Sequence, residues 1–436
     1  MKRYWFCFVS FVLFFLSGAP LLKAEVRVVV TPVGQCQSLG LPIPDSLHFQ
    51  KGEKVRFRIT AFEDSIQVKP DAVYYTFNED KMNPSPRAGI RSVDGAFTTP
   101  PATMRKEGFL RCNAEVLYRG KTYKGHSMVG FDVQNLQPTV QMPSDFIAWW
   151  NVQIDTASQI DPDPEIELLS DLCTDSVNVY EVSVQAVEEG FRVHGILAMP
   201  KMEGRYPVVM RAPGAGVHKI GGMIEEAKQG VITLDLGIHG LSLTQPDDYY
   251  VRLSKGELKD YPFAGLASRY TYYYRRVYLS ALRMVDYLST LPQFDGQHLY
   301  VCGGSQGGAL SIVCAALSPK VTAIETFFPA LADQEAYLHG RAGGWPHYFS
   351  AHCTDANIRS IAREMAYFDV ANFARIVSKP VFMSFGLADI TCAPTCTYAT
   401  WNSLSSPDKC LVITPQIGHR RDLKVWAEGW QWMLRH

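Results

Sequence analysis

The sequence has almost no net charge, and it lacks the motifs by which several classes of protein are recognised. Its 42 Lys and Arg residues nearly balance 43 Asp and Glu residues, so the formal net charge is -1. This balance leaves no electrostatic footprint for nucleic acid or for an anionic membrane surface. The glycine-rich run at residues 303–308 contains no lysine and therefore does not match a nucleotide-binding P-loop. We predict a protein with no nucleic-acid partner and no cofactor.

Metal-ligating residues at a useful spacing are also missing. Cys392 and Cys396 have no second ligand pair at the spacing of a zinc site. His347 and His352 are five positions apart, which places them on different faces of a helix. The sequence therefore predicts no metal site.

The start of the chain resembles a secretory signal more than a membrane span. Lys2 and Arg3 precede an apolar stretch from Tyr4 to Leu16, and small residues follow before position 25. The apolar stretch is shorter than the about 20 residues that a spanning helix needs. We predict a cleaved signal at residues 1–24 and a periplasmic or secreted protein with no membrane span after cleavage. An uncleaved membrane anchor is the alternative.

Residues 25–138 have the pattern of an all-β domain. Short segments alternate apolar and polar residues, as half-buried strands do, and no helical period lasts ten residues. The turn Arg119-Gly120-Lys121 predicts a hairpin. Strands at this spacing predict a small immunoglobulin-like sandwich. The candidate strands are 26–30, 55–59, 73–77, 115–118 and 122–123.

The pattern changes after Pro138, where apolar strands begin to alternate with helices. Continuous apolar strands with helical crossovers predict a mostly parallel sheet covered on both faces, so residues 139–436 are expected to form an α/β domain. The predicted strands are 180–184, 191–200, 208–210, 231–234, 299–302, 323–327, 381–384 and 411–413, and the predicted helices include 272–288, 309–317 and 398–404.

The run Gly303-Gly304-Ser305-Gln306-Gly307 is the strongest single indication of function. It lies between an apolar strand and a helix, which is the setting of the nucleophile elbow in α/β-hydrolases. Glycines are needed there because side chains at positions 303 or 307 would collide with the neighbouring strand or helix. The alternative is an ordinary structural turn.

A serine hydroxyl is a weak nucleophile until a base takes its proton. α/β-Hydrolases place the acid and then the histidine after the serine, on loops that follow later strands. Asp389 and His419 satisfy this order. Taken singly, Asp389 could instead cap a turn and His419 could be an unremarkable loop residue. Asp422 is a weaker rival acid because it follows the histidine.

The oxyanion that forms during acyl transfer needs hydrogen-bond donors. One is expected to be the backbone N–H of Gln306, directly after the nucleophile. The second is expected from the loop after the strand 208–210, which is the glycine-containing segment 211–218. The alternative for that segment is an ordinary turn.

These residues resemble the acetyl xylan esterase / cephalosporin C deacetylase family, a group of carbohydrate esterases with the α/β-hydrolase fold. The resemblance runs from about Asp145 to the C-terminus. It is carried by the following segments: Tyr274-Arg275-Arg276-Val277-Tyr278-Leu279, Gly303-Gly304-Ser305-Gln306-Gly307-Gly308, Tyr367-Phe368-Asp369, Asn372-Phe373-Ala374, Gly386-Leu387-Ala388-Asp389, and Gly418-His419.

The resemblance implies hydrolysis of acetyl esters on sugars, with the triad Ser305, Asp389 and His419 and with oxyanion donors at Gln306 and Ala215. Where the family usually has a tyrosine after His-Gly, this chain has Ala215 after Pro-Gly, which predicts a wider acyl pocket. Family members often form ring-like hexamers, so the resemblance leaves a homo-oligomer open.

The family's Arg-Gly-Gln motif is replaced by other residues in this sequence. The chain has Gly237-Ile238-His239-Gly240 there, so the local contacts must differ although the fold should hold. Arg420 follows the histidine where the family usually has a glutamate. We therefore expect differences in substrate preference more than in mechanism.

Three functions follow from different readings of these features. The leading hypothesis is a secreted serine esterase that deacetylates acetylated oligosaccharides through an acyl-enzyme. The runner-up is a serine peptidase of the prolyl-oligopeptidase type, although about 110 residues before the hydrolase are too few for its usual propeller. The third is a non-catalytic glycan-binding protein. In it, aromatic residues of the front region stack on sugars (Tyr74, Tyr75, Phe77, Tyr118 and Tyr123). Alternating aromatics more commonly fill a sandwich core.

Overall fold

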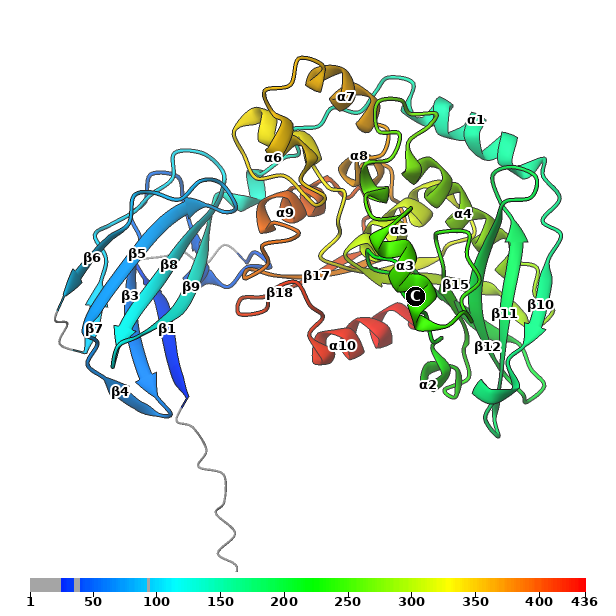
Figure 1. Cartoon of the computed structure of the whole chain (residues 1–436), viewed down its shortest axis with the longest axis horizontal. Coiled ribbons are helices and arrows are strands. Elements are labelled where there is room, and N and C mark those ends of the chain that lie inside the picture. The colour runs from blue at the N-terminus through cyan, green and yellow to red at the C-terminus, as the bar shows by residue number, and fades with distance from the viewer. Residues whose placement is uncertain (1–24, 35–39, 92–94) are drawn as a thin grey trace, which may run out of the picture.

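The structure is a computed structural model that describes residues 25–34, 40–91 and 95–436 (Figure 1). The predicted signal segment, residues 1–24, lies outside the described residues. In residues 25–34, 40–91 and 95–436, no helix is long and apolar enough to cross a membrane.

The N-terminal β region, residues 25–138, contains two sheets and contributes no α-helix in its described part. The first sheet runs in the order β1-β3-β4, with β7 also paired to β3, and the second runs β2-β9-β8-β5-β6. The strands of the first sheet are β1 Val26–Val33, β3 Arg56–Glu63, β4 Ile66–Val68 and β7 Ala96–Thr98. Those of the second are β2 His48–Phe49, β5 Ala72–Glu79, β6 Ala88–Arg91, β8 Gly108–Tyr118 and β9 Lys121–Phe131.

The predicted hairpin is confirmed as β8 and β9, which pair antiparallel from Tyr118↔Lys121 to Gly108↔Phe131. Arg119 and Gly120 form its turn with φ of 49° and 72°. Two consecutive positive φ angles match the twist of the flanking strands, which is why two-residue hairpin turns favour them. Each strand is eleven residues long, so the hairpin extends well beyond the segments expected from the sequence.

Aromatic residues help to fill the space between these two sheets. The ring of Phe57 on β3 lies 5.8 Å from that of Phe77 on β5, and Tyr75 lies 5.7 Å from Phe97 on β7. Of the aromatics that could have stacked on sugars, Tyr75 and Phe77 therefore belong to the packing between the sheets. Tyr118 instead donates a hydrogen bond to Glu63 at the edge.

The C-terminal α/β region is built on one nine-stranded sheet in the order β10-β11-β12-β14-β13-β15-β16-β17-β18. The first four strands in this order pair antiparallel, and every pairing from β14 to β18 is parallel. The strands are β10 Glu165–Leu168, β11 Val177–Gln185, β12 Arg192–Pro200, β13 Tyr206–Arg211, β14 Ile232–Leu236, β15 Phe294–Gly304, β16 Ala323–Phe327, β17 Val381–Gly386 and β18 Lys409–Thr414.

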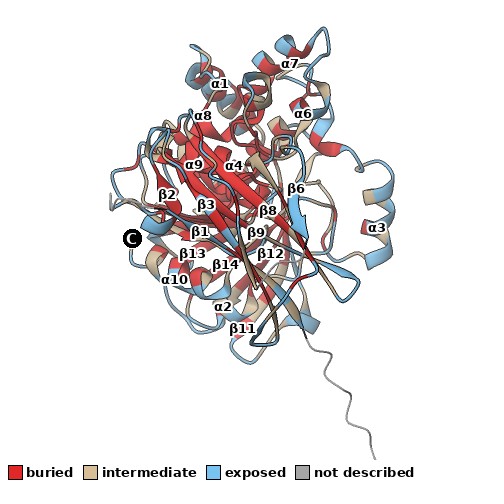
Figure 2. Ribbon diagram, turned by 90° about the vertical axis from the view of Figure 1, so that its left-hand side faces the viewer, coloured by how far each residue is buried: buried red, intermediate tan, exposed pale blue. Residues whose placement is uncertain are grey.

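Helices cover both faces of this sheet, as predicted. They are α1 Phe146–Ser158, α2 Ile224–Ala227, α3 Asp247–Lys255, α4 Tyr273–Leu288, α5 Gln306–Leu317, α6 Tyr348–His352, α7 Ile358–Met365, α8 Val370–Ala374, α9 Pro394–Ser403 and α10 Leu423–Met433. Val208 and Met210 of β13 join the large core cluster that includes α4 and α5, whereas Val209 packs in a cluster with residues of α10. Successive residues of a strand point to opposite faces, so this alternation places one core on each side of the sheet. Figure 2 shows buried residues along the strands and a largely exposed outer helix α3.

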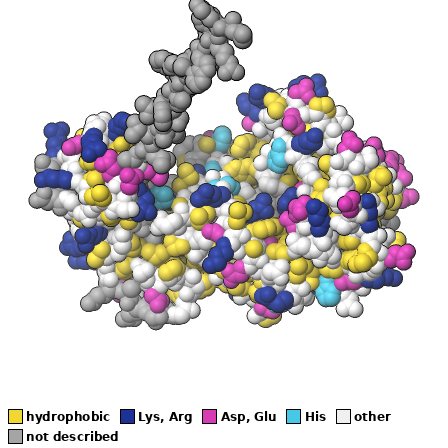
Figure 3. Space-filling model, turned by 90° about the horizontal axis from the view of Figure 1, so that it is seen from below, with side chains coloured by type: hydrophobic (Ala, Val, Ile, Leu, Met, Phe, Trp, Pro, Cys, Tyr) yellow, Lys and Arg dark blue, Asp and Glu magenta, His cyan; other side chains and the backbone are white. Residues whose placement is uncertain are grey.

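The surface carries charges of both signs. Basic and acidic side chains are interspersed on the face shown in Figure 3, in keeping with the net charge of -1.

The two regions pack directly against one another. Phe109 of β8 and Tyr398 of α9 bring their rings to 5.9 Å. Asn402, also on α9, donates hydrogen bonds to the carbonyls of Val133 and Leu136. The side of the α/β region that faces the β region therefore includes α9, the helix that directly follows the loop after β17.

Candidate active site

Ser305 lies in a sharp turn between β15 and α5. Its φ of 60° and ψ of -122° are strained for a residue with a side chain, as expected of a nucleophile elbow. The close packing around the turn leaves no room for a side chain at the neighbouring glycines. A Cβ on Gly307 would lie 2.2 Å from the carbonyl oxygen of Ala212, and one on Gly303 would lie 2.6 Å from the backbone of Gly307.

The structure brings together the three side chains that the sequence analysis singled out. Nε2 of His419 lies 3.0 Å from Oγ of Ser305, and Nδ1 of His419 lies 2.8 Å from Oδ2 of Asp389. Asp389 follows β17 and His419 follows β18, so both come from loops at the carboxyl ends of parallel strands. Such ends meet at one edge of the sheet.

Asp389 is fully buried and its carboxylate is held from both sides. Its Oδ1 accepts hydrogen bonds from the backbone N–H groups of Thr391 (2.7 Å) and Cys392 (2.9 Å), while Oδ2 faces His419. A carboxylate accepting at Nδ1 selects the tautomer in which Nε2 can take a proton. This arrangement can therefore make His419 a general base toward Ser305.

Asp422, the rival acid, occupies a different place. Its carboxylate accepts hydrogen bonds from the backbone N–H groups of Lys424 and Val425 and so caps the N-terminus of α10. This is a common role for aspartate at a helix start, and it leaves Asp389 as the carboxylate that contacts the histidine.

Cys392 is a neighbour of the serine that the sequence analysis considered only as a metal ligand. The buried thiol interacts with the Ser305 side chain. Burial raises the pKa of Cys392 well above its usual range, so the thiol stays protonated near neutral pH and is a poor nucleophile. The spacing between Cys392 and Cys396 in the sequence did not indicate that Cys392 lies beside Ser305.

The Gln306 side chain joins the elbow to the loop after β13. Its Oε1 accepts hydrogen bonds from the hydroxyls of Tyr261 and Tyr274, and its Nε2 lies 3.3 Å from the carbonyl oxygens of Pro213 and Gly214. Burial raises the pKa of Tyr261 to about 12, so this phenol remains a donor. The sequence indicated a role only for the backbone of Gln306.

The same loop contains the residue expected to supply the second oxyanion donor. The N–H of Gly216 donates to the Tyr261 hydroxyl at 3.1 Å. In the hydrogen bonds of residues 25–34, 40–91 and 95–436, the exposed Ala215 has no partner for its N–H. The amide of Ala215 is thus available where that of Gly216 is not.

The side chain of His239 connects this loop to Tyr273 of α4. Its Nε2 lies 3.0 Å from the carbonyl of Gly216 and its Nδ1 lies 2.6 Å from the hydroxyl of Tyr273. The carbonyl can only accept, so Nε2 carries the proton and Nδ1 accepts from the tyrosine. Burial lowers the pKa of His239 to about 4, which keeps the ring neutral. The unusual segment 237–240 therefore holds the loop in place.

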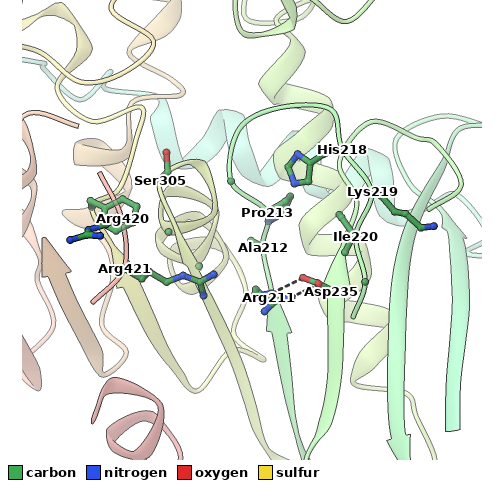
Figure 4. Close-up of a pocket in the computed structure, with 15 residues that line it drawn as sticks. Arg211, Ala212, Pro213, His218, Lys219, Ile220, Asp235, Ser305, Arg420 and Arg421 are labelled. Carbon is green, nitrogen blue, oxygen red and sulfur yellow. Dashed lines mark hydrogen bonds and ion pairs between the residues drawn. The ribbon is translucent and has the colours of Figure 1, made fainter. Parts of the chain in front are cut away.

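A polar cavity of about 400 Å³ adjoins Ser305. Figure 4 shows Ser305 between the segment that carries Arg420 and Arg421 and the loop after β13, with Arg211 paired to Asp235 on the cavity floor. The cavity is lined by Arg211, Ala212, Pro213, Gly214, His218, Lys219, Ile220, Gly221, Asp235, Gly303, Gly304, Ser305, Phe328, Arg420 and Arg421. Hydrogen-bonding and cationic groups dominate this wall, which suits a hydroxyl-rich ligand better than a lipid chain.

Comparison with known proteins agrees with the geometry. The model of the acetyl xylan esterase (AXE1) family matches residues 128–436. The chain is 36% identical over 354 residues to acetyl esterase Axe7A of Xylanibacter ruminicola, covering 80% of this chain and 79% of that protein.

Solved structures share the fold of a large part of the chain. The acetyl xylan esterase from Paenibacillus sp. R4 matches with a TM-score of 0.61 at 24% identity, covering 70% of this chain and 98% of that one. Acetyl xylan esterase 1 from Thermoanaerobacterium sp. JW/SL YS485 matches with a TM-score of 0.59 at 22% identity, covering 70% and 97%. These structures are esterases of the α/β-hydrolase type, as the sequence analysis expected of residues 139–436.

Proposed function

The chain belongs to the acetyl xylan esterase family and is a carboxylic ester hydrolase, and from that premise we propose that it is a secreted serine esterase that removes acetyl groups from xylan or other oligosaccharides. The observation that carries the proposal is the contact series from Ser305 through His419 to Asp389, at 3.0 and 2.8 Å. The signal-like residues 1–24 support secretion.

The proposed reaction proceeds through an acyl-enzyme. His419 takes the proton of Ser305, and Oγ attacks the acetyl carbonyl carbon to give a tetrahedral oxyanion. The backbone N–H groups of Gln306 and Ala215 stabilise that oxyanion. The intermediate then collapses to the acyl-enzyme: the bond from the carbonyl carbon to the sugar oxygen breaks, and His419 protonates that departing oxygen. A water molecule, deprotonated by His419 in turn, releases acetate and regenerates the serine, while Asp389 orients the imidazole throughout.

The surroundings of Ser305 support a small acyl group on a polar alcohol. The adjoining cavity is lined by several cationic and backbone polar groups. A sugar can form hydrogen bonds to such a wall, whereas a long acyl chain would leave its polar groups without partners. Ala215 is not among the residues that line this cavity, so the wider acyl pocket expected from the sequence stays a prediction.

Two parts of the proposal concern the β region. We propose that residues 25–138 form an immunoglobulin-like domain, which the two facing sheets of β1–β9 support. A propeller peptidase is disfavoured, because sheets of four and five strands do not amount to the several four-stranded blades of a propeller.

The test is acetate release by the purified protein from acetylated xylo-oligosaccharides and from p-nitrophenyl acetate. Wild type should turn over both, and Ser305→Ala should retain only the contribution of the oxyanion donors and of binding, about 10³-fold over water. A wild-type rate no better than that of Ser305→Ala contradicts the proposal. Cleavage of aminoacyl-proline substrates without ester hydrolysis would favour the peptidase, and glycan binding without turnover would favour a binding protein.

A further inference from the structure

The β region reaches into the loop that carries Asp389. Two of its charged residues are buried at the boundary with the α/β region: Asp80, directly after β5, and Arg111, on β8. They are 1% and 4% exposed. Asp80 adopts a left-handed φ of 48°, a conformation that aspartate tolerates better than most residues. This turn points its side chain toward α9 instead of the solvent.

Arg111 and the neighbouring cation Lys81 both bind the backbone of the acid loop. We define the acid loop as residues 386–392. Nη2 of Arg111 donates to the carbonyl oxygens of Leu387 and Asp389, both at 3.2 Å. Nζ of Lys81 donates to the carbonyl of Ile390 at 2.9 Å. Three carbonyls within four consecutive residues are thus bonded to side chains from another part of the chain.

Asp80 links Arg111 to the helix that follows the acid loop. Its carboxylate lies 3.7 Å from Nη2 of Arg111 and accepts a hydrogen bond from the N–H of Thr395 at 2.8 Å. Thr395 is in the first turn of α9, where a carboxylate is stabilised by the helix dipole. The Asp80–Arg111 pair therefore contacts both the backbone of the acid loop and the start of the helix that follows it.

The position of the Asp389 carboxylate depends on this backbone. Oδ1 is fixed by N–H groups of Thr391 and Cys392, both within the acid loop. The N–H of Ala388 donates to the carbonyl of Ile417 at 3.1 Å, which couples the acid loop to the segment before His419. A shift of the loop backbone would therefore move the carboxylate relative to the imidazole.

A buried ion pair adds little net stability compared with well-packed apolar residues. Stability alone is thus a weak reason for placing Asp80 and Arg111 here. The solved esterases are matched over 98% and 97% of their own length by 70% of this chain, so the rest of this chain has no matched counterpart in them.

We propose that Arg111 and Asp80 are positioning residues for ester hydrolysis, and that the β region is a working part of the catalytic unit because it fixes the loop of Asp389. The inference rests on the proposed triad. It assigns the β region a role other than glycan capture.

The experiment compares full-length variants at this boundary. Arg111→Met removes the bonds to the acid loop, and Arg111→Lys restores a cation that can reach one carbonyl. Asn402→Ala is the matched control, because Asn402 also donates to two carbonyls across the same boundary but does not touch the acid loop. Thermal unfolding and circular dichroism show that each variant is folded.

Two readouts separate positioning from mere folding. The first is the steady-state kcat and KM with p-nitrophenyl acetate. The second is the rate at which a p-nitrophenyl phosphonate labels Ser305, which depends on the triad and not on the natural substrate. A displacement of about 1 Å can cost up to about 100-fold in rate, so Arg111→Met should lower kcat and the labelling rate by about 10- to 100-fold with KM changed less than about twofold.

Arg111→Lys should recover part of the loss, and Asn402→Ala should lower the melting temperature while keeping kcat close to wild type. Folded Arg111→Met with wild-type kcat and labelling overturns the inference, as does an equal loss of kcat in Asn402→Ala. If Arg111→Met does not fold, the Lys81→Met variant tests the inference instead, because Lys81 is exposed. A several-fold lower labelling rate in Lys81→Met supports the positioning role, and an unchanged rate overturns the inference. Wild-type protein that is labelled by the phosphonate but releases no acetate would contradict the proposed function alone.

Discussion

The hydroxyl of Tyr274 donates a 2.7 Å hydrogen bond to Oε1 of Gln306, and both side chains are fully buried. Tyr261 donates to the same oxygen at 2.8 Å. The amide nitrogen of Gln306 points the other way, toward the carbonyls of the loop after β13. One side chain thus connects α4, the elbow and the loop expected to bind the oxyanion.

Replacing Gln306 should therefore damage both stability and catalysis. Gln306→Leu leaves two buried tyrosine hydroxyls without their acceptor, and an unsatisfied buried polar group costs about 1–3 kcal/mol. We expect the free energy of unfolding in urea to fall by several kcal/mol and kcat to fall because the loop is released. Tyr274→Phe is the control, since Tyr261 still serves Oε1, and its loss should be near 1 kcal/mol. Equal stability of wild type and Gln306→Leu would refute this account.

Asp389→Asn tests the assignment of the acid. An amide at this position can donate to Nδ1 of His419 and so favour the wrong tautomer, which should lower kcat by about 10⁴-fold with little change in KM. Asp422→Asn is the matched control because that residue caps α10. It should lose at most about 1 kcal/mol of stability and keep its kcat. Comparable kcat losses in both variants would refute the assignment.

The packing of Gly386 against Ile417, in the segment before His419, predicts a steric effect. A Cβ on Gly386 would lie 1.9 Å from the carbonyl oxygen of Ile417, which is backbone and cannot rotate away. Gly386→Ala should therefore push the segment before His419 and lower kcat by at least about tenfold, as measured with p-nitrophenyl acetate. A Cβ on Gly418, in the same segment, would meet its nearest atom at 3.7 Å. Gly418→Ala should be close to wild type, and a reversed order of the two variants would contradict the packing.

Acid should destabilise the protein through His239. Its pKa lies at about 4 in the folded protein, below its ordinary 6.5, because of burial. The unfolded chain therefore binds the proton first, so stability is lost as pH falls from 6.5 toward 4, by at most about 1.4 kcal/mol per pH unit from this group.

Urea unfolding at several pH values measures this effect. His239→Gln keeps a donor for Gly216 and an acceptor for Tyr273, and its stability should fall less steeply below pH 6.5 than that of wild type. Burial also lowers the pKa of His347 to about 4, but both proteins contain that residue, so the difference in slope isolates His239. Identical slopes would refute the prediction.

The parts of the fold that sequence could predict are those that local pattern encodes. The strands and helices around Ser305 have continuous apolar runs, and the predicted segments 299–302 and 309–317 lie within β15 and α5. The order of serine, aspartate and histidine along the chain then predicted three residues that meet in space. By contrast, β10 alternates acidic and apolar residues over only four positions, all of them exposed, and so short a pattern was not assigned to a strand.

The support of the site could not be predicted because it depends on pairs that are distant in the chain. Neither Arg111 nor the carbonyl of Leu387 has a local sequence signal for their contact, since backbone acceptors leave no trace in side-chain identity. The same holds for His239 and the carbonyl of Gly216. Gln306 was expected to act through its backbone, and only the fold shows that its amide side chain is the centre of a network.

The contact between Arg111 and the acid loop spans 276 and 278 positions of the chain. The β region is synthesised first, at about 5–20 residues per second. Arg111 is therefore made many seconds before the acid loop that it binds. Contacts of such long range are also slow to form during folding. The catalytic centre should accordingly be among the last features of the molecule to mature, docking onto a surface that has already folded.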